Sequence, residues 1–311
     1  MYDVKVLKLG LDLYSGASSD KNGGLFEYNL VKGKILDIVD KFKSNIKENI
    51  LFVVNGSADE QAQKQILEDY AGYKKVFIAT DFFAFDKNKM MIENCDIILH
   101  QSMTNKLPMD LKAKSVFSCI PFLFYHYPSE KAIKSQNNRM IFGGANTGRD
   151  DKFKEYINPD TEAYLDAFTK IYNEDGSIKF DKRIPYDKFM ERFEDYSYAL
   201  MITRREYTDY QWFTPRFVEA VSNWALPIID YDFPVPAEMY TCKHMATLNR
   251  NCMIKNIMYF NNNLEEKDKM LSYLSSYILS MQAKFDWLIY SIISGLENNT
   301  IDIYNNNFIC L

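Results

Sequence analysis

Continuous apolar runs alternate along this chain with segments whose apolar residues recur at helical spacing. In the first half, the strand-like runs are Val4–Gly10, Ile50–Val54, Lys75–Ala79 and Asp96–Leu99, and the helical segments between them are Leu25–Phe42 and Asp59–Tyr70. A strand that is apolar along its whole length needs cover on both faces, and helices that connect parallel strands supply it. The alternation therefore predicts an α/β fold built on parallel sheets.

The pattern lapses near Ile120–Asn138, where prolines, aromatics and polar residues indicate a connection, and then it restarts. The expected strands that follow are Met140–Phe142, Tyr198–Ile202 and Leu226–Asp230, and the expected helices are Thr161–Ile171 and Phe213–Trp224. Because single cores stop growing near ~250–300 residues, a chain of 311 residues favours two domains.

We therefore expect two Rossmann-like, doubly wound domains that face each other across a cleft, because open α/β sheets bind their ligands at the carboxyl ends of their strands. The first domain is expected at 1–125, a linker at 126–138 and the second domain at 139–280. A C-terminal helix and tail, expected at 281–311, can pack back on the first domain.

Composition narrows the class of protein. Apolar residues make up 47% of the chain and charged residues 25%, as in soluble globular proteins. The N-terminus has no signal-peptide pattern, and Met270–Leu296 is interrupted by Lys284 and Asp286, so it falls short of a ~18-residue membrane span. The sequence thus predicts a soluble, cytoplasmic protein, expected to be a monomer.

Metal and disulfide frameworks are not indicated. The five cysteines are odd in number and scattered, with no CxxC spacing, and the histidines are too dispersed to read as a metal cluster. The net charge of −5 argues mildly against a nucleic-acid partner, although a local surface can be basic while the whole chain is acidic. We therefore expect no structural metal.

The segment Thr214–Ile229 is the most specific in the chain. In a helix that begins near Thr214, Arg216 and Glu219 share one face at the N-terminal end. A helix N-terminus favours a diphosphate, and an arginine there adds charge-assisted bonds, while a carboxylate one turn later can accept both ribose hydroxyls. An isolated pair of this kind is more often a surface ion pair; the small-residue turn and the apolar strand that follow favour a nucleotide site.

This segment resembles the GT-B glycosyltransferases, and in detail the DNA β-glucosyltransferase family of T-even phages. The resemblance runs in the same order over residues 4–235. It includes Val53–Ser57, Ala79–Phe82, Ile141–Gly144, Arg183–Pro185 and Thr214–Ile229. None of these motifs is specific alone, but their shared order and similar spacing argue against a chance match.

The resemblance implies an inverting transferase that takes glucose from UDP-glucose, with the donor held mainly by the second domain and the acceptor by the first. Asp81, directly after an expected strand, matches the family's general base; by composition alone it would be the N-cap of the segment that follows. A loosely bound Mg²⁺ or Mn²⁺ is also implied, through the product diphosphate.

The implied donor site consists of residues in the second domain. Their positions match a phosphate-binding loop, its arginine, the uracil contact and the helix described above: Gly143, Gly144, Arg149, Ile184, Arg216 and Glu219. Two adjacent glycines are equally well explained by a tight turn, and Ile184 by an ordinary apolar residue entering a helix.

The chain departs from the family pattern at three places. Where the family has a second arginine early in the phosphate loop, this chain has Ala145-Asn146-Thr147. The loop around Tyr207, which approaches the donor in the family, differs in length. For the family's sugar-contacting glutamate the candidates are Asp20, Gly24 and Glu27.

The implied acceptor is the hydroxymethyl group of 5-hydroxymethylcytosine or 5-hydroxymethyluracil in duplex DNA, a modification that would shield phage DNA from restriction. An enzyme of this kind must flip the base out and hold it between apolar or aromatic side chains. Candidates for the base are Phe82, Phe83 and Phe85, and candidates for the backbone are Lys106, Lys112, Lys114, Lys131, Lys134 and Arg139. The aromatics could equally lie in the core, and the basic residues in solvated loops.

Two other functions remain open from the sequence. The same fold could use a protein, a lipid-linked sugar or a small molecule as acceptor, which the acidic net charge favours. A non-catalytic nucleotide-binding or DNA-binding module on the same scaffold would be consistent with the missing loop arginine.

Overall fold

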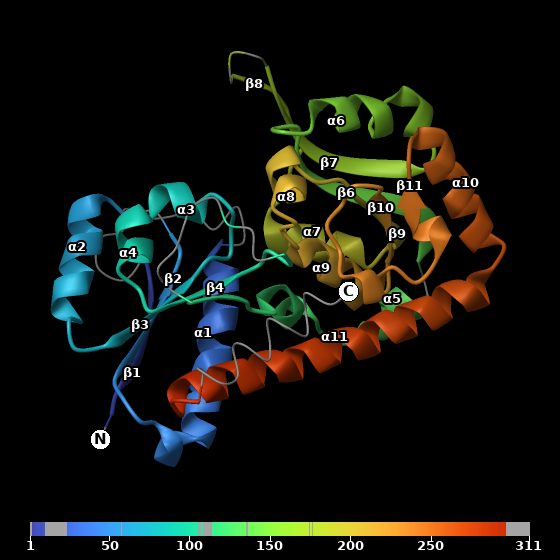
Figure 1. The fold of residues 1–311 in the computed structure, drawn as a ribbon. Coiled ribbons are helices and arrows are strands. Elements are labelled where there is room, and N and C mark those ends of the chain that lie inside the picture. Colours follow the sequence, from blue (N-terminus) through green and yellow to red (C-terminus); the bar gives the residue numbers. More distant parts are fainter. Residues whose placement is uncertain are drawn as a thin grey trace. The chain divides into compact units, whose positions relative to one another are not determined.

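The computed structural model describes residues 2–9, 24–56, 58–104, 107, 114–134, 136–173, 175 and 177–296. The chain divides into two compact units, whose helices and strands are labelled in Figure 1. Unit 1 comprises 1–123, 210–212 and 280–311, and unit 2 comprises 124–209 and 213–279. The expected linker at 126–138 thus belongs to unit 2, where it contains a short helix and the start of a strand.

Unit 1 is built on a five-stranded sheet in which all neighbours are parallel. The strands follow one another in chain order, β1-β2-β3-β4-β5. Its elements are β1 (Val4–Lys8), α1 (Gly24–Lys41), β2 (Ile50–Val54), α2 (Glu60–Asp69), β3 (Lys74–Ile78), α3 (Ala84–Lys87), α4 (Lys89–Glu93), β4 (Ile97–His100) and β5 (Lys114–Phe117), with 3-10 turns at Lys43–Asn45 and Ile120–Phe124.

Burial explains why these segments form the core of unit 1. Every residue of β2 is buried, as expected of a parallel strand covered on both faces. Helix α1 contributes a buried stripe at helical spacing, formed by Tyr28, Val31, Ile35 and Ile38. The Tyr28 hydroxyl also donates to the Val6 carbonyl (3.2 Å), which ties the helix to β1.

Unit 2 is built on a six-stranded sheet of order β11-β10-β9-β6-β7-β8, in which only the β7–β8 pair is antiparallel. Its elements are α5 (Glu130–Lys134), β6 (Asn137–Ala145), α6 (Asp150–Tyr156), β7 (Leu165–Tyr172), β8 (Ile178–Asp181), α7 (Tyr186–Phe193), β9 (Tyr196–Met201), α8 (Arg205–Asp209), α9 (Pro215–Ser222), β10 (Leu226–Asp230), β11 (Ala246–Thr247) and α10 (Arg250–Asn261), with 3-10 turns at Pro159–Thr161, Ala237–Met239 and Lys243–Met245.

The strand order of unit 2 reverses between β6 and β9. The chain starts at β6, builds outward to β7 and β8, and then returns to the other side of β6 to add β9, β10 and β11. This is the doubly wound order that the sequence predicts. At the reversal the carboxyl ends of β6 and β9 are neighbours, and the connections that leave them run toward opposite sides of the sheet.

One expected helix of unit 2 is wrong. Thr161–Ile171 was expected to be helical, but Leu165–Tyr172 forms β7, which pairs in parallel with β6 from Met140 opposite Leu165 to Ala145 opposite Lys170. Aromatic and β-branched residues in Phe168–Tyr172 suit a strand. Only two of its eight residues are buried, so the continuous apolar run that marked the other parallel strands is absent.

The long helix α11 (Leu264–Ile293) contributes to both units, with the division after Leu279. In unit 1 its C-terminal part packs on N-terminal elements: Asp286 pairs with Lys34 of α1 (3.0 Å) and Gln282 donates to the Phe122 carbonyl (2.9 Å). No helix within the described ranges is both long and apolar enough to cross a membrane.

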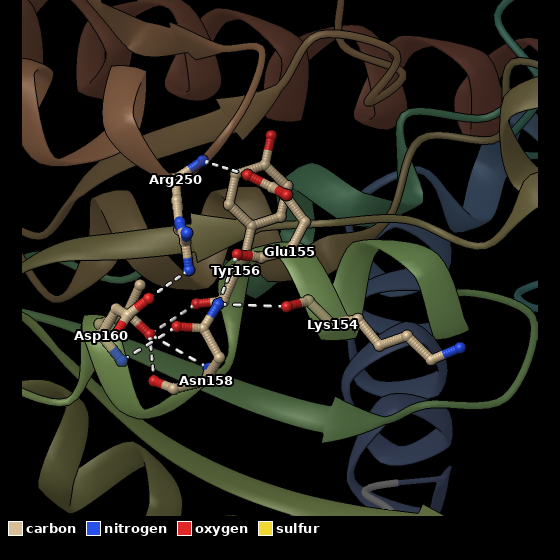
Figure 2. A network of polar contacts seen from close by, with 7 residues as sticks. Lys154, Glu155, Tyr156, Asn158, Asp160 and Arg250 are labelled. Atoms are coloured by element: carbon tan, nitrogen blue, oxygen red, sulfur yellow. Dashed lines mark hydrogen bonds and ion pairs between the residues drawn. The ribbon is translucent and has the colours of Figure 1, made fainter.

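A polar network joins the end of α6 to the start of α10 in unit 2 (Figure 2). Glu155 accepts a hydrogen bond from the backbone N–H of Arg250 (2.9 Å), whose guanidinium pairs with Asp160. Asn158 accepts from the Asp160 N–H and donates to the carbonyls of Lys154 and Glu155, which closes the last turn of α6. The side chain of Asn249 caps α10 by accepting from Cys252 N–H (3.0 Å).

Two neighbouring substitutions should distinguish how much the helix cap and the surface ion pair at the start of α10 each contribute to the free energy of unfolding. Asn249→Ala leaves an N–H of α10 unsatisfied and should lower the free energy of unfolding by about 1 kcal/mol. Arg250→Ala removes only an exposed ion pair and should change it by less than ~1 kcal/mol. Urea denaturation of the two variants measures both, and a larger loss for Arg250→Ala would contradict this assignment.

Candidate functional site

The carboxyl edge of the unit 2 sheet, at the reversal between β6 and β9, is where an open α/β sheet binds its ligand. Here β6 ends in Gly143-Gly144-Ala145, and a loop leads to Arg149 and α6. The loop is anchored by Asn146, which is buried and bonds to Asp150 (2.6 Å) and to the backbone of Tyr172 (2.9 Å). Asn146 thus has a structural role at the start of this loop.

Gly143 lies where a side chain cannot fit. A Cβ at this position would come within 2.6 Å of the Phe189 ring of α7, so the glycine allows the ring to lie against the end of β6. The same ring is contacted by Arg216, whose guanidinium carbon is 4.8 Å from the ring centroid. The absence of a side chain at Gly143 therefore also affects Arg216, because it allows the position of the aromatic ring that this candidate phosphate-binding arginine contacts.

Arg149 is a cation without a matching anion. Its Nη1 donates to the Ile202 carbonyl (2.9 Å) just beyond β9, and within the described residues no carboxylate forms an ion pair with it. Burial, followed by the positive charges of Arg204 and Arg216, lowers the pKa of the Arg149 guanidinium to about 10. The group stays charged at neutral pH, but its charge is destabilised, so a bound anion would be favoured there.

Unpaired hydrogen-bond donors lie at the same edge. The Nε of Arg149 and the hydroxyl of Thr203, two residues beyond β9, are buried and have no hydrogen-bond partner. Buried donors of this kind are rare in folded proteins and each calls for an explanation. Together with the positive charge, they are suited to an anion with several acceptor oxygens.

Arg216 and Glu219 share one face of α9, as the sequence predicts. Arg216 Nη1 is 2.8 Å from Glu219 Oε2, but the two are not aligned as a hydrogen bond, so the contact is an ion pair that leaves donor capacity on the arginine. Thr214, the N-cap of α9, makes no side-chain capping bond, so it does not occupy the helix N-terminal N–H groups. A helix N-terminus without a side-chain cap favours an anion.

The carboxylate of Glu219 is held on both sides. Its side chain is 5% exposed, and while Oε2 faces Arg216, Oε1 accepts a hydrogen bond from the Tyr186 hydroxyl (2.7 Å). Tyr186 is the first residue of α7, two residues after the half-buried Ile184. The structure thus brings Gly143, Gly144, Arg149, Arg216, Glu219 and the Ile184 segment to one region of unit 2.

Two residues of this site were missed by the sequence analysis. Arg204 lies three residues beyond the end of β9, in a run of charged residues that looks like a solvated loop, and only its place near the end of an expected strand could have drawn attention to it. Tyr186 is 33 positions away from Glu219, so no local pattern links them. Tyr207, on α8, has its ring 5.9 Å from the Arg204 guanidinium.

In unit 1, Asp81 lies just beyond β3 at the carboxyl edge of that sheet. Its Oδ1 accepts from the Phe83 N–H (3.3 Å), whereas α3 has Phe83 as its N-cap residue. Asp81 is thus not the N-cap residue of α3, although its carboxylate accepts from the N–H two residues on, as a capping side chain does.

Other polar side chains meet beside Asp81. The Thr80 hydroxyl lies 3.0 Å from Glu27 Oε2 and 2.7 Å from Asn55 Oδ1, and Asn55 also accepts from the Thr80 N–H (2.7 Å). Of the three candidates for a sugar-contacting carboxylate, Asp20 lies outside the described residues and Gly24 begins α1. Glu27, in the first turn of α1, is the one that reaches this edge.

The aromatic candidates for acceptor binding lie mostly in the interior of unit 1. Phe82 is buried against Tyr210 (4.7 Å between ring centroids) and Trp212 (6.0 Å), and Phe85 is buried against Trp212 (6.0 Å). Phe83 is only half-buried. The alternative that these aromatics belong to the core thus applies to Phe82 and Phe85.

The basic candidates divide into two groups. Lys106 and Lys112 lie outside the described residues, and Lys114 is exposed at the start of β5. The other three are paired with carboxylates: Lys131 with Asp195, Lys134 with Glu130, and Arg139 with Asp166. Those pairs reduce the positive charge that this segment offers to a polyanion.

Within the ranges that the structure describes, no group of three or more His, Cys, Asp or Glu side chains could hold a metal ion. The acidic residues Asp230 and Asp232, at the end of β10, both form ion pairs with Lys152. None of the residues named above is therefore assigned to a metal.

Comparison with known proteins shows the fold. No protein-family model matches this chain, and no curated protein matches it by sequence. Three similar solved structures are T4 phage β-glucosyltransferase (TM-score 0.64, 16% identity, covering 96% of this chain and 99% of that one), the T4 phage enzyme in complex with UDP and Mn²⁺ (0.61, 14%, 94% and 99%), and the DNA modifying enzyme β-glucosyltransferase with and without uridine diphosphoglucose (0.63, 14%, 94% and 99%). The predicted GT-B fold is therefore confirmed.

A methyl group at Gly143 should displace Phe189 and disturb the site. Gly143→Ala is expected to lower the free energy of unfolding by about 1–3 kcal/mol, because the new Cβ overlaps the ring. Gly33→Ala is the matched control, since nothing lies within 4 Å of a Cβ there and alanine favours the α1 helix by about 0.5–1 kcal/mol. Chemical denaturation should give effects of opposite sign; equal stability of both variants would contradict the overlap.

Proposed function

We propose that this chain is an inverting glycosyltransferase that moves glucose from UDP-glucose to the hydroxymethyl group of a modified pyrimidine in duplex DNA. The observation that carries the proposal is the cationic, partly unpaired site at the strand reversal of unit 2, on a fold shared with phage β-glucosyltransferase. A nucleoside diphosphate sugar supplies the phosphate oxygens that such a site accepts.

The donor is oriented by groups with distinct tasks. Arg149, Arg216 and the N–H groups around Gly144 and the start of α9 neutralise the diphosphate, which must leave with additional negative charge. Glu219 accepts the ribose hydroxyls, and its two held oxygens are already oriented before the donor arrives. Ile184 supplies an apolar contact for the uracil ring.

The proposed reaction is a single displacement at the anomeric carbon. Asp81 takes the proton of the acceptor hydroxyl as its oxygen bonds to the anomeric carbon, and the bond from that carbon to the UDP oxygen breaks on the opposite side. The electron pair of the broken bond stays on UDP, where the arginines stabilise it, and the sugar configuration inverts. The proposed step assigns none of the chain's residues to a metal, although one comparison structure contains UDP and Mn²⁺.

A second acceptor class is favoured by one observation. The net charge is −5, and Lys131, Lys134 and Arg139 are each paired with a carboxylate, which weakens the case for a DNA-binding surface. The same donor chemistry would then serve a protein, lipid-linked or small-molecule hydroxyl.

A transfer assay separates these acceptors. The protein is incubated with UDP-glucose and duplexes that contain cytosine, 5-hydroxymethylcytosine or 5-hydroxymethyluracil, and the digested nucleosides are weighed. A hexose gain on one hydroxymethylated nucleoside, with UDP release and no gain on cytosine, supports the proposal. UDP release without a gain on any duplex shows that water cleaves the donor, so the donor chemistry stands and these duplexes are not the acceptor, as the second acceptor class requires. No UDP release in any of these mixtures contradicts transfer to DNA.

Removing the base of the proposed reaction should affect turnover and not donor binding. Asp81→Asn is expected to lower the transfer rate by about 10²-fold or more, because the amide cannot take the hydroxyl proton. Asp86→Asn, on the exposed face of α3, is the control and should retain the wild-type rate. An Asp81→Asn variant with normal turnover would remove Asp81 from this role.

The carboxylate of Glu219 should confer preference for a ribose. Glu219→Gln is expected to weaken UDP binding by about 1–3 kcal/mol and to reduce the preference for UDP over 2′-deoxy-UDP, because a charged acceptor is lost. Glu191→Gln, on the exposed face of α7, is the matched control. Calorimetry with both nucleotides measures the difference, and an unchanged preference would place the ribose elsewhere.

A further inference from the structure

The positive charge at the strand reversal comes from both sides of it. On the β6 side, the loop before α6 offers one cation, Arg149, because its earlier positions are Ala145, Asn146 and Thr147 and Asn146 is committed to structure. On the β9 side, the first cation beyond the strand is Arg204. A ligand held at the reversal would therefore meet Arg149 from one strand and Arg204 from the other.

Contacts with the β6 loop fix the position of Arg204. A Cβ built on Gly148 would lie 3.5 Å from both Cβ and Cγ of Arg204, and the Arg205 N–H donates to the Gly148 carbonyl (3.2 Å). Gly148 has φ +70°, a conformation that side-chain-bearing residues rarely adopt. The glycine thus lets the stem of Arg204 lie directly against the loop, and the Tyr207 ring, 5.9 Å from the guanidinium, flanks its other end.

The charges around this loop can be compared one by one. Arg204 and Arg216 both lower the pKa of Arg149, so the three guanidinium groups interact, while Glu219 offsets Arg216. Glu206 also reaches the loop: its Oε2, buried and without a hydrogen-bond partner, would lie 3.2 Å from a Cβ on Gly148. Asp150, the first residue of α6, is a further carboxylate at this loop and is bonded to Asn146 (2.6 Å), while unpaired donors remain on Arg149 and Thr203.

We propose that Arg204 is a third diphosphate-binding residue of this site, which contacts the donor phosphates from the β9 side as Arg149 does from the β6 side. The inference rests on the proposed function, because it assumes that a nucleoside diphosphate binds at the strand reversal. The second cationic contact to the phosphates thus comes from the segment that follows β9, because the β6 loop offers Arg149 alone.

The test compares Arg204→Gln with Arg205→Gln by calorimetry with UDP, UMP and uridine. Arg205 is the matched control because it is the next residue, carries the same charge, and has a side chain that is 88% exposed. Arg204→Gln should weaken UDP binding by about tenfold to a hundredfold, weaken UMP less, and leave uridine unchanged. Arg205→Gln should stay within about twofold of wild type for all three ligands.

Three results would overturn the inference. These are wild-type UDP affinity in Arg204→Gln, an equal loss for uridine and UDP, which indicates a structural effect, or an equal loss in Arg205→Gln, which indicates general charge. Arg204→Lys provides a second variant: because it retains the positive charge beside Arg149, it should recover part of the UDP affinity and its ligand-free form should melt at about the wild-type temperature.

The two proposals fail in different ways. If wild type binds neither UDP nor uridine, the proposed donor site is wrong and Arg204 loses its ligand. If wild type binds UDP and Arg204→Gln binds it equally well, only the role of Arg204 is wrong, and Arg149 and Arg216 remain the diphosphate-binding residues of the proposed function.

Discussion

The reversal of strand order between β6 and β9 is the constraint on which the candidate donor site depends. Connections that leave two neighbouring parallel strands toward opposite sides of a sheet leave a space at their carboxyl ends. The chain places Gly143 and Gly144 at the end of β6 and Thr203 and Arg204 after the end of β9. The hydrogen bond from Arg149 to the Ile202 carbonyl then joins the two strand ends, so the cations are positioned by the topology itself.

The electrostatics of this edge are unbalanced in the free protein. Glu219 has a partner for each oxygen, Arg216 and Tyr186, so it is fixed and its charge is offset. Arg149 is buried beside like charges and keeps an unbonded Nε, an arrangement that lowers stability unless an anion binds. Functional sites commonly retain such local conflicts, because the ligand resolves them.

The sequence predicts the parts of this fold whose pattern is local. Residues Leu226–Asp230 form β10 with the expected bounds, because the strand is a continuous run of buried residues. Helix α1 begins and ends within one residue of Leu25–Phe42, because its buried residues recur at helical spacing. Strand β7 was missed because most of its residues are only half-buried, so its apolar spacing is ambiguous. Arg204 and Tyr186 were missed because their partners come from distant segments, which no local spacing reveals.

The two units present polar edges of opposite character, and the proposed reaction needs both. In unit 1, the Glu27 carboxylate accepts a hydrogen bond from Thr80, and Asp81 is the next residue after Thr80, just beyond β3. The proposed reaction needs a proton acceptor at this edge. In unit 2, guanidinium groups and uncapped N–H groups stabilise negative charge, which suits a departing diphosphate. A module that only bound nucleotides would use the cationic edge alone. The rate of Asp81→Asn relative to its donor affinity therefore distinguishes a transferase from a binding module, because in the proposed reaction the acidic edge serves catalysis and not donor binding.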